Sequence, residues 1–120
     1  MKPLVSVVMN CYNGEIYLKE AVESVVNQTY QNWELIFWDN RSTDKSKKIL
    51  DQFSDSRIKY FLSQSHVKQY TARIEAMKKT TGKFIAFLDV DDYWANDKLE
   101  KQLKLFEDDE VAFICSNAWI

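Results

Sequence analysis

The sequence predicts an α/β protein with three layers, in which helices cover both faces of a mainly parallel sheet. Short runs rich in valine, isoleucine and aromatic residues alternate with segments whose apolar residues recur at helical spacing. Strict alternation of this kind favours parallel strands joined by right-handed crossovers. The chain has 120 residues, of which 46% are hydrophobic and 14% aromatic, which is enough for one small domain over residues 1–120.

Each element follows from a local pattern. The predicted strands are the apolar runs 4–9, 33–38, 58–62, 83–88 and 111–115. Asn13-Gly14 is a turn signal, and a helix is expected after it over residues 15–28. Ser42, Thr43 or Asp44 can cap a second helix, whose apolar residues are Ile49, Leu50 and Phe53. Tyr70, Ile74 and Met77 mark a third helix, which ends near Gly82. Asn96 or Asp97 can cap a fourth helix, whose apolar residues are Leu99, Leu103 and Phe106.

Polar residues follow three of the predicted strands, at positions 10–13, 39–42 and 89–92. The last two of these segments carry carboxylates. Ligands of open α/β sheets bind beyond the carboxyl ends of the strands. Three polar strand ends therefore predict a functional site at this edge of the sheet.

Asp89 and Asp91 give the sharpest local signal. They directly follow an apolar run and stand two residues apart, so in extended chain both side chains point to the same side. Two negative charges about 6 Å apart repel by about 3 kcal/mol at an effective dielectric constant of 20. No Lys or Arg adjoins them in the sequence, so a hard divalent cation, Mn²⁺ or Mg²⁺, is the natural counter-charge. A solvated turn is the structural alternative.

An aromatic ring, a hydrogen-bonding acid and an acid pair together suit a nucleoside diphosphate. Tyr12 is expected to stack on a base, and Asp39 to accept a hydrogen bond from a base N–H. Arg73 is expected to contact the base or a phosphate, while Asp91 and Asp89 hold the metal against the diphosphate. The structural alternatives are a tyrosine packed on the first helix, a turn acid and a surface ion pair.

Composition excludes some classes of function. The formal net charge is −2, with 16 basic and 18 acidic residues, which argues against nucleic acid as a partner. Cys11 and Cys115 match neither a metal-binding spacing nor a disulfide framework, and a cytoplasmic location is expected. His66 has no acid or cysteine at catalytic spacing and is expected to be a loop residue.

Two further functional classes fit a chain of this length and alternation. A receiver-like domain that accepts a phosphoryl group would need its acid cluster after the first strand, where this chain has Asn10-Cys11-Tyr12-Asn13. A phosphatase with an aspartate nucleophile would also carry its Asp-x-Asp on the first strand. A dinucleotide-binding domain is disfavoured, because the chain has only two glycines and no Gly-x-Gly-x-x-Gly.

Five segments in order and spacing resemble the N-terminal, donor-binding half of a family 2 glycosyltransferase with the GT-A fold, a Rossmann-like architecture. They lie at 5–13, 21–30, 38–44, 72–73 and 87–102, so the resemblance covers nearly the whole chain. It implies transfer of a sugar from a UDP-linked donor to an unknown acceptor, with inversion, in polysaccharide or glycolipid assembly, and leaves open attachment to the inner face of the membrane. The nucleotide-binding residues it implies are Tyr12, Asn13, Asp39, Arg73 and Asp89, and the metal ligands are Asp91 and Asp89.

The chain departs from the family pattern at three positions near the site. Asn10 stands where proline is frequent, Asn40 replaces the second acid of an Asp-Asp pair, and Arg41 replaces a glycine. If the glycine position requires a positive φ, arginine there costs about 1 kcal/mol.

Length is the larger departure. The resemblance places the general base that inversion requires well after the Asp-x-Asp segment, so we expect no catalytic base in this chain and little transferase activity from it alone. A truncated sheet would leave an unpaired edge strand beside an apolar patch. We therefore expect a partner chain, such as a second copy in a homo-oligomer, to cover that edge.

Overall fold

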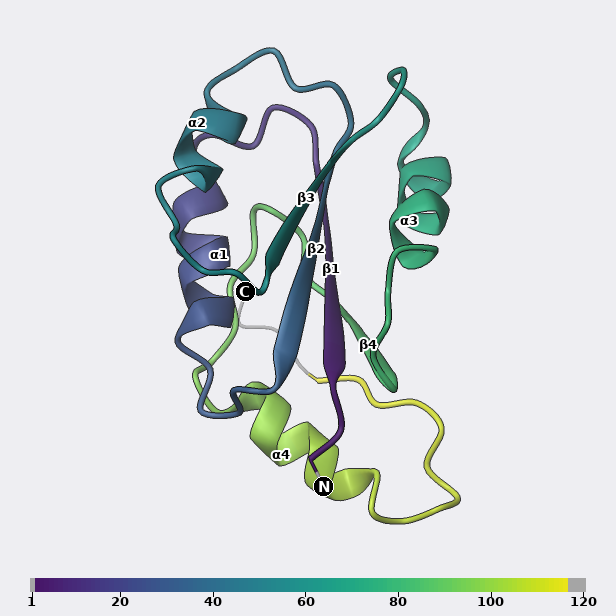
Figure 1. Cartoon of the computed structure of the whole chain (residues 1–120). Helices are drawn as coiled ribbons and strands as arrows, with labels where there is room; N and C mark the ends of the chain where they lie inside the picture. The colour runs from purple at the N-terminus through teal and green to yellow at the C-terminus, as the bar shows by residue number, and fades with distance from the viewer. Residues whose placement is uncertain (1, 117–120) are drawn as a thin grey trace.

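The computed structural model describes residues 2–116, which form three layers around a parallel sheet (Figure 1). The strands are β1 (Val5–Cys11), β2 (Trp33–Asp39), β3 (Ile58–Leu62) and β4 (Phe84–Phe87), and the helices are α1 (Leu18–Val26), α2 (Ser46–Leu50), α3 (Gln69–Met77) and α4 (Lys98–Leu105). Every helix and the first four strands predicted from the sequence are confirmed, with ends that differ by a few residues. None of the helices in these residues combines the length and the hydropathy that a membrane span requires.

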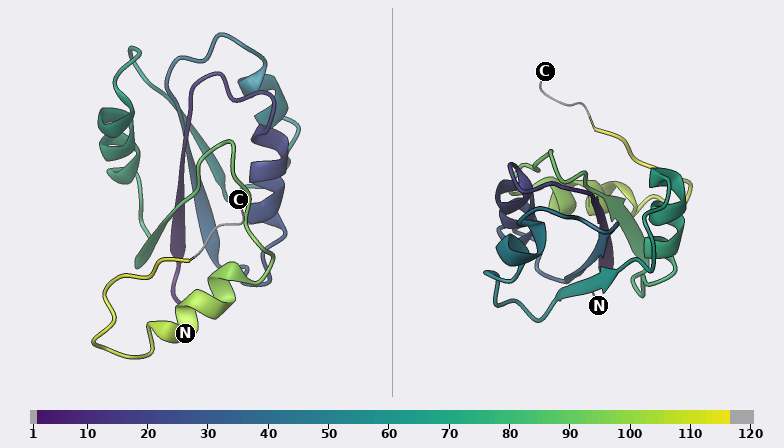
Figure 2. Two further views of the ribbon diagram at one scale, coloured as in Figure 1. Left: turned by 180° about the vertical axis from the view of Figure 1, so that it is seen from behind. Right: turned by 90° about the horizontal axis from the view of Figure 1, so that it is seen from above.

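The order of the strands fixes where the chain changes direction. The sheet runs β3-β2-β1-β4, and each neighbouring pair is parallel. The chain moves from β1 through β2 to β3 and then crosses back to the other side of β1. Because such crossovers share one hand, the reversal puts α3 on the face opposite α1 and α2 (Figures 1 and 2). The carboxyl ends of β1 and β4 therefore flank a topological switch point.

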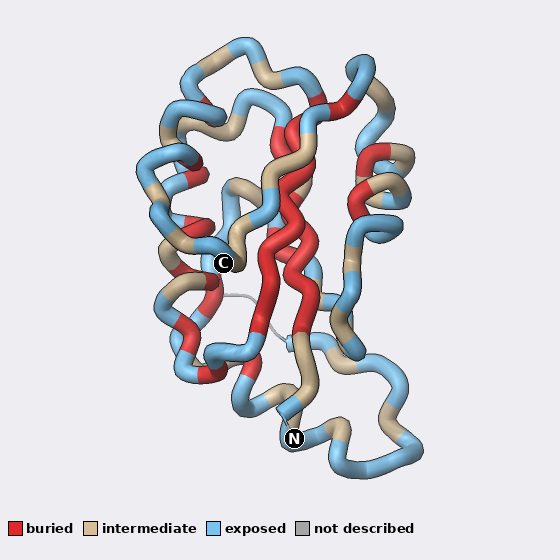
Figure 3. The backbone as a smooth tube through the Cα atoms, in the orientation of Figure 1, coloured by how far each residue is buried: buried red, intermediate tan, exposed pale blue. Residues whose placement is uncertain are grey.

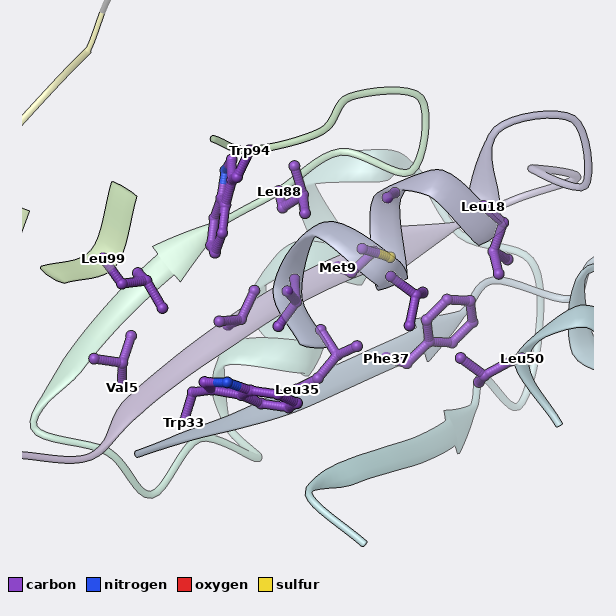
Figure 4. Close-up of a cluster of buried hydrophobic side chains, with 14 of the residues drawn as sticks. Val5, Met9, Leu18, Trp33, Leu35, Phe37, Leu50, Leu88, Trp94 and Leu99 are labelled. Carbon is purple, nitrogen blue, oxygen red and sulfur yellow. The ribbon is translucent and has the colours of Figure 1, made fainter. Parts of the chain in front are cut away.

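The main core lies between the sheet and the layer of α1, α2 and α4. Strands β1 and β2 are buried along nearly their whole length (Figure 3). Alternate residues of these strands, such as Met9, Leu35 and Phe37, pack with Leu18 and Leu50 of the helices (Figure 4). This layer fixes the strands that carry the polar residues at their carboxyl ends.

Gln28 joins α1 to the start of α4. Its side-chain amide group donates hydrogen bonds to the carbonyls of Ser24, at 2.9 Å, and Ala95, at 2.7 Å, and its Oε1 accepts the N–H of Leu99 at 3.0 Å. Gln28 is 1% exposed, so this hydrogen bonding satisfies a buried amide that would otherwise be costly. These bonds anchor the segment that follows the Asp-x-Asp residues, including the start of α4, to the end of α1.

Helix α3 is buried through its small residues. Tyr70, Ile74 and Met77, which mark this helix in the sequence, are all exposed, while Ala72 and Ala76 are buried against β1 and β2. Alanines four residues apart let the helix approach the sheet closely, and the bulky Trp38 already fills that layer. The large apolar residues of α3 therefore lie on its outer side.

The predicted fifth strand is wrong. Residues 111–116 form no strand, and in Figure 2 this part of the chain runs away from the sheet. An apolar run forms a strand only where it pairs with the edge of a sheet, and residues 111–116 make no such pairing. Among the described residues β4 pairs only with β1, so it is an edge strand, and its Ile85 and Phe87 are 40% and 44% exposed.

A buried carboxylate ties the start of β4 to the sheet. Glu34 in β2 is 3% exposed, and its Oε1 accepts hydrogen bonds from Ser6 Oγ at 2.6 Å and the N–H of Thr81 at 2.8 Å. Lys59 Nζ lies 2.6 Å from Glu34 Oε2, and the N–H of Gly82 donates to Ser6 Oγ at 2.8 Å. Burial alone would raise the pKa of Glu34, but the hydrogen bonds from Lys59, Ser6 and Thr81 outweigh it and lower the pKa to about 2.

Candidate functional site

A pocket of about 620 Å³ lies at the carboxyl edge of the sheet, at the switch point between β1 and β4. It is lined by the end of β1 and the turn after it, by Asn40 after β2, by the loop before α3, and by residues 89–91 after β4. The sequence predicted a site at this edge from three polar strand ends, and all three of those segments contribute to the pocket.

Tyr12 and Asn13 form the turn after β1. Tyr12 is 51% exposed and lines the pocket, so part of its ring is accessible to a ligand. Asn13 has φ of 53°, a left-handed conformation that asparagine tolerates better than most residues. Its Oδ1 accepts the N–H of Thr43 at 2.7 Å, and its own N–H donates to Ser42 Oγ at 3.0 Å. The turns after β1 and β2 are therefore fastened to each other.

Gly14 brings the turn after β1 against the acidic loop. A Cβ at Gly14 would lie 2.6 Å from Cγ2 of Val90 and 2.9 Å from its Cγ1, closer than side chains tolerate. Only glycine allows this approach without a shift of Val90. Because Val90 stands between Asp89 and Asp91, the contact fixes the acidic loop relative to Tyr12.

The acidic loop gathers three carboxylates. Asp89, Asp91 and Asp92 are exposed, and each offers an oxygen within 4.8 Å of the others. Partial burial and the negative charges of Asp91 and Asp89 raise the pKa of Asp92. Arg73 on α3 lies 3.4 Å from Asp89 Oδ1 and 5.2 Å above the centre of the Phe87 ring. The predicted acid pair and Arg73 therefore meet, although Arg73 does not line the pocket.

Asp39 takes a position different from the other predicted residues. It is 2% exposed and does not line the pocket. Its Oδ1 accepts the N–H of Ser42 at 2.8 Å, and its Oδ2 accepts the hydroxyl of Tyr60 at 2.6 Å. Burial and this bond to Asp39 raise the pKa of Tyr60 and keep its hydroxyl protonated. These contacts are those of a turn acid, which was the structural alternative to a base-binding role for Asp39. A contact from Asp39 to a base stays a prediction.

Arg41 has the positive φ that its position requires. Its φ is 67°, which is left-handed and unfavourable for a residue with a Cβ. Its guanidinium makes a long hydrogen bond, 3.4 Å, to the carbonyl of Ser63. The conditional prediction from the sequence, that arginine is strained at this turn, is confirmed by the backbone.

His66 is a residue of the pocket that sequence reasoning did not assign to the site. It lies in the loop between β3 and α3, as expected, but it lines the pocket and its ring centroid is 4.4 Å from that of Tyr12. Nothing beside His66 in the sequence indicates this contact. The only available signal was topological, since every loop that follows a parallel strand opens at the same edge.

Asn10 brings an unpaired polar group to the pocket. Its side-chain Nδ2 and Oδ1 are both buried and have no hydrogen-bond partner among residues 2–116. Buried amide atoms without a partner are rare and costly in folded proteins. The residue that departs from the proline of the family pattern thus lines the pocket with a free donor and a free acceptor.

The family described as Glycosyl transferase family 2 matches residues 6–119. An uncharacterized glycosyltransferase of Haemophilus influenzae is 47% identical over 103 residues, 84% of this chain and 41% of that protein. UDP-Glc:alpha-D-GlcNAc-diphosphoundecaprenol beta-1,3-glucosyltransferase WfgD of Escherichia coli is 40% identical over 114 residues, 95% of this chain and 45% of that protein. The chain thus spans less than half the length of either relative.

Solved structures match the same region. Residues 1–349 of S. aureus TarS in complex with UDP have a TM-score of 0.81 and 26% identity, covering 89% of this chain and 32% of that one. A mannosyltransferase from Pyrobaculum calidifontis in complex with GDP-Man and Mn²⁺ has a TM-score of 0.82 at 22% identity, covering 90% of this chain and 33% of that one. The second likeness speaks only for the fold, and both agree with the predicted architecture.

Proposed function

Because the chain belongs to glycosyl transferase family 2, we propose that it binds a UDP-linked sugar, the donor from which a transferase moves the sugar to an acceptor. One observation carries this proposal: a single pocket at the switch point joins the exposed ring of Tyr12 to the carboxylates of Asp89 and Asp91. The names of the WfgD relative and of the TarS complex, which mention UDP-Glc and UDP, support the uridine donor. The receiver-like and phosphatase-like alternatives lose their support, because the family match covers the acidic loop.

Asp91 and Asp89 are proposed to hold the divalent cation, Mn²⁺ or Mg²⁺. Carboxylate oxygens within 4.8 Å of one another are the hard donor set that these ions prefer, so the residues present fit the metal. When bound, the ion would supply positive charge against the diphosphate leaving group. Arg73, 3.4 Å from Asp89, keeps one carboxylate in place and adds a further positive charge beside the phosphates.

The nucleoside is proposed to lie along the turn after β1. Tyr12 offers its exposed ring for stacking on the base, and Asn13 holds the turn in its left-handed conformation. Asp39 is proposed to assist base recognition. A carboxylate oxygen has more than one acceptor position, so the hydrogen bonds from Ser42 and Tyr60 do not exhaust its capacity.

We assign no catalytic base for the inverting reaction. The acidic residues 107–110 follow α4, at the end of the sheet opposite the pocket, and lie too far away to serve (Figure 1). The acceptor is proposed to be a lipid-linked sugar at the inner face of a membrane, in polysaccharide assembly. The name of the WfgD relative, which specifies a diphosphoundecaprenol acceptor, supports this.

The free edge of β4 is proposed to be covered by another chain, such as a second copy. Ile85 and Phe87 expose apolar surface beside backbone groups of β4 that pair with no strand within residues 2–116, which favours pairing with another strand. Sedimentation of the chain as a monomer at high protein concentration would contradict this.

Calorimetric titration with UDP, with and without Mn²⁺, tests the donor site. We expect Mn²⁺ to strengthen UDP binding, and Asp91→Asn to weaken metal-dependent binding by about tenfold or more. Asp109→Asn, the same chemical change beyond α4, is the matched control and should bind like the wild type. UDP affinity that responds neither to Mn²⁺ nor to Asp91→Asn would refute the proposed function.

A further inference from the structure

One wall of the pocket is an aromatic pair built from different parts of the chain. Tyr12 follows β1 and His66 follows β3, yet their ring centroids are 4.4 Å apart and their planes are inclined by 57°. Tyr12 remains 51% exposed despite this contact. The imidazole therefore supports one part of the phenol ring and leaves another part open to the pocket.

The hydrogen bonding of His66 fixes its ring. Its Nδ1 lies 3.0 Å from the backbone carbonyl oxygen of Asn40. A carbonyl oxygen only accepts, so Nδ1 carries the proton and donates it. This bond restrains the rotation of the imidazole and holds it on the side of the pocket where Tyr12 lies.

The loop that carries His66 is held independently of the imidazole. The side chain of Asn40 donates from Nδ2 to the carbonyl of Val67 at 2.7 Å and accepts the N–H of Val67 at Oδ1 at 2.9 Å. Only an amide side chain makes both bonds, because a carboxylate has no N–H to donate. Asn40 is 5% exposed, and its own N–H donates to the carbonyl of Cys11 at 2.8 Å. Asn40 thus couples the loop before α3 to the end of β1, where Tyr12 begins its turn.

We propose that His66 is a positioning residue for the nucleobase: it braces the Tyr12 ring so that the open part of that ring stacks on the base. The inference rests on the proposed function, since it needs a nucleotide in this pocket. An unbraced tyrosine at an exposed turn would sample several rotamers, and ordering it on binding would weaken the affinity. His66 therefore contributes to base affinity and adds nothing to the binding of the phosphates.

The test compares a ligand that has a base with one that lacks it. UDP and inorganic pyrophosphate are titrated in Mg²⁺ into the wild type and His66→Ala. We expect His66→Ala to weaken UDP binding by about two- to tenfold, the range for loss of an aromatic contact, and to leave pyrophosphate binding unchanged. Gln64→Ala, an exposed change in the same loop, is the matched control and should alter neither.

Two further variants separate bracing from other roles. His66→Phe keeps an aromatic ring while the Asn40–Val67 pair still holds the loop, so it should bind UDP within about twofold of the wild type. In a Tyr12→Ala background, His66→Ala should cause no additional loss, because the ring that it braces is gone. Equal losses of UDP binding in His66→Phe and His66→Ala, or additive losses with Tyr12→Ala, would overturn the inference.

The chain has one histidine, so the NMR signals of its two imidazole C–H protons can be assigned without overlap from other histidines. Proton contacts to the Tyr12 ring should be visible in the free protein, and UDP should shift these signals far more than pyrophosphate does. Normal UDP binding in His66→Ala would overturn the bracing role alone. A wild-type chain that binds pyrophosphate but shows no preference for UDP would overturn both this inference and the proposed function.

Discussion

Replacing Glu34 with glutamine should change how the stability of the domain depends on pH. The carboxylate is buried in a network with Ser6, Lys59 and Thr81 that ties the start of β4 to the sheet. A carboxyl group whose pKa is lowered by folding stabilises the native state above its unfolded pKa and loses that contribution as the pH falls. For Glu34 the loss begins near its ordinary value of 4.5 and is complete below about 2.

The magnitude follows from the two pKa values. A fall from 4.5 to about 2, at about 1.4 kcal/mol per pKa unit, corresponds to about 3 kcal/mol of stabilisation at neutral pH. Because protonation is incomplete at pH 3, about 2 kcal/mol of this contribution is lost between pH 7 and pH 3. The side chain is 4% exposed, so solvent screening reduces the figure little.

Urea unfolding of the wild type and Glu34→Gln at a series of pH values measures this contribution. The variant should be less stable at pH 7, and the difference in the free energy of unfolding should shrink by about 2 kcal/mol by pH 3, because glutamine does not titrate. Glu107→Gln, an exposed position after α4, is the matched control and should show no comparable change. A difference between wild type and Glu34→Gln that stays constant from pH 7 to pH 3 would refute the reasoning.

Two backbone positions give further predictions. Gly14→Ala should displace Val90, lower stability by about 1–3 kcal/mol and weaken metal-dependent UDP binding by about tenfold or more. Val90→Ala in the same chain should restore much of the stability and of the UDP binding. Urea unfolding and UDP titration check this, and unchanged UDP binding in Gly14→Ala would contradict it. Arg41→Gly should stabilise the protein by about 0.5–1 kcal/mol, because relief of the left-handed strain at φ 67° exceeds the entropic cost of glycine. A lower midpoint of urea unfolding in Arg41→Gly would count against that interpretation.

The sequence indicated the layers of the fold and the position of the site, because both depend on periodic patterns. Alternation of strands and helices predicted the parallel sheet, and polar strand ends predicted the pocket that contains Tyr12, Asn13, Asp89 and Asp91. The errors arose where pairing or packing decides. The composition of residues 111–115 predicts a strand, but this run pairs with no strand of the described sheet. Whether an apolar run pairs depends on a free sheet edge beside it, and the run itself carries no sign of that.

Helix α3 and Asp39 show the same limit at the level of single residues. Large apolar residues mark a buried stripe in most helices, but α3 packs through Ala72 and Ala76 because close approach to the sheet needs small side chains. Asp39 is polar and ends a strand, as a binding residue does, yet Ser42 and Tyr60 hold both of its oxygens. Ser42 is a local partner, as expected for a turn acid, whereas Tyr60 comes from β3 and no local pattern indicates its bond; a contact from Asp39 to a base stays a prediction.

The arrangement of the pocket separates two contributions to nucleotide binding. The acidic loop after β4 is positioned by the contact between Gly14 and Val90, whereas the aromatic wall is positioned by Asn40 through Val67 and His66. Both supports meet at the turn after β1, since Gly14 belongs to that turn and Asn40 bonds to the carbonyl at the end of the strand. Changes at the outer ends of the pocket should therefore affect either the phosphates or the base, and changes that shift the backbone of the turn, such as Gly14→Ala, should affect both. If Gly14→Ala altered only one of the two, the supports would not share the backbone of the turn as their common anchor.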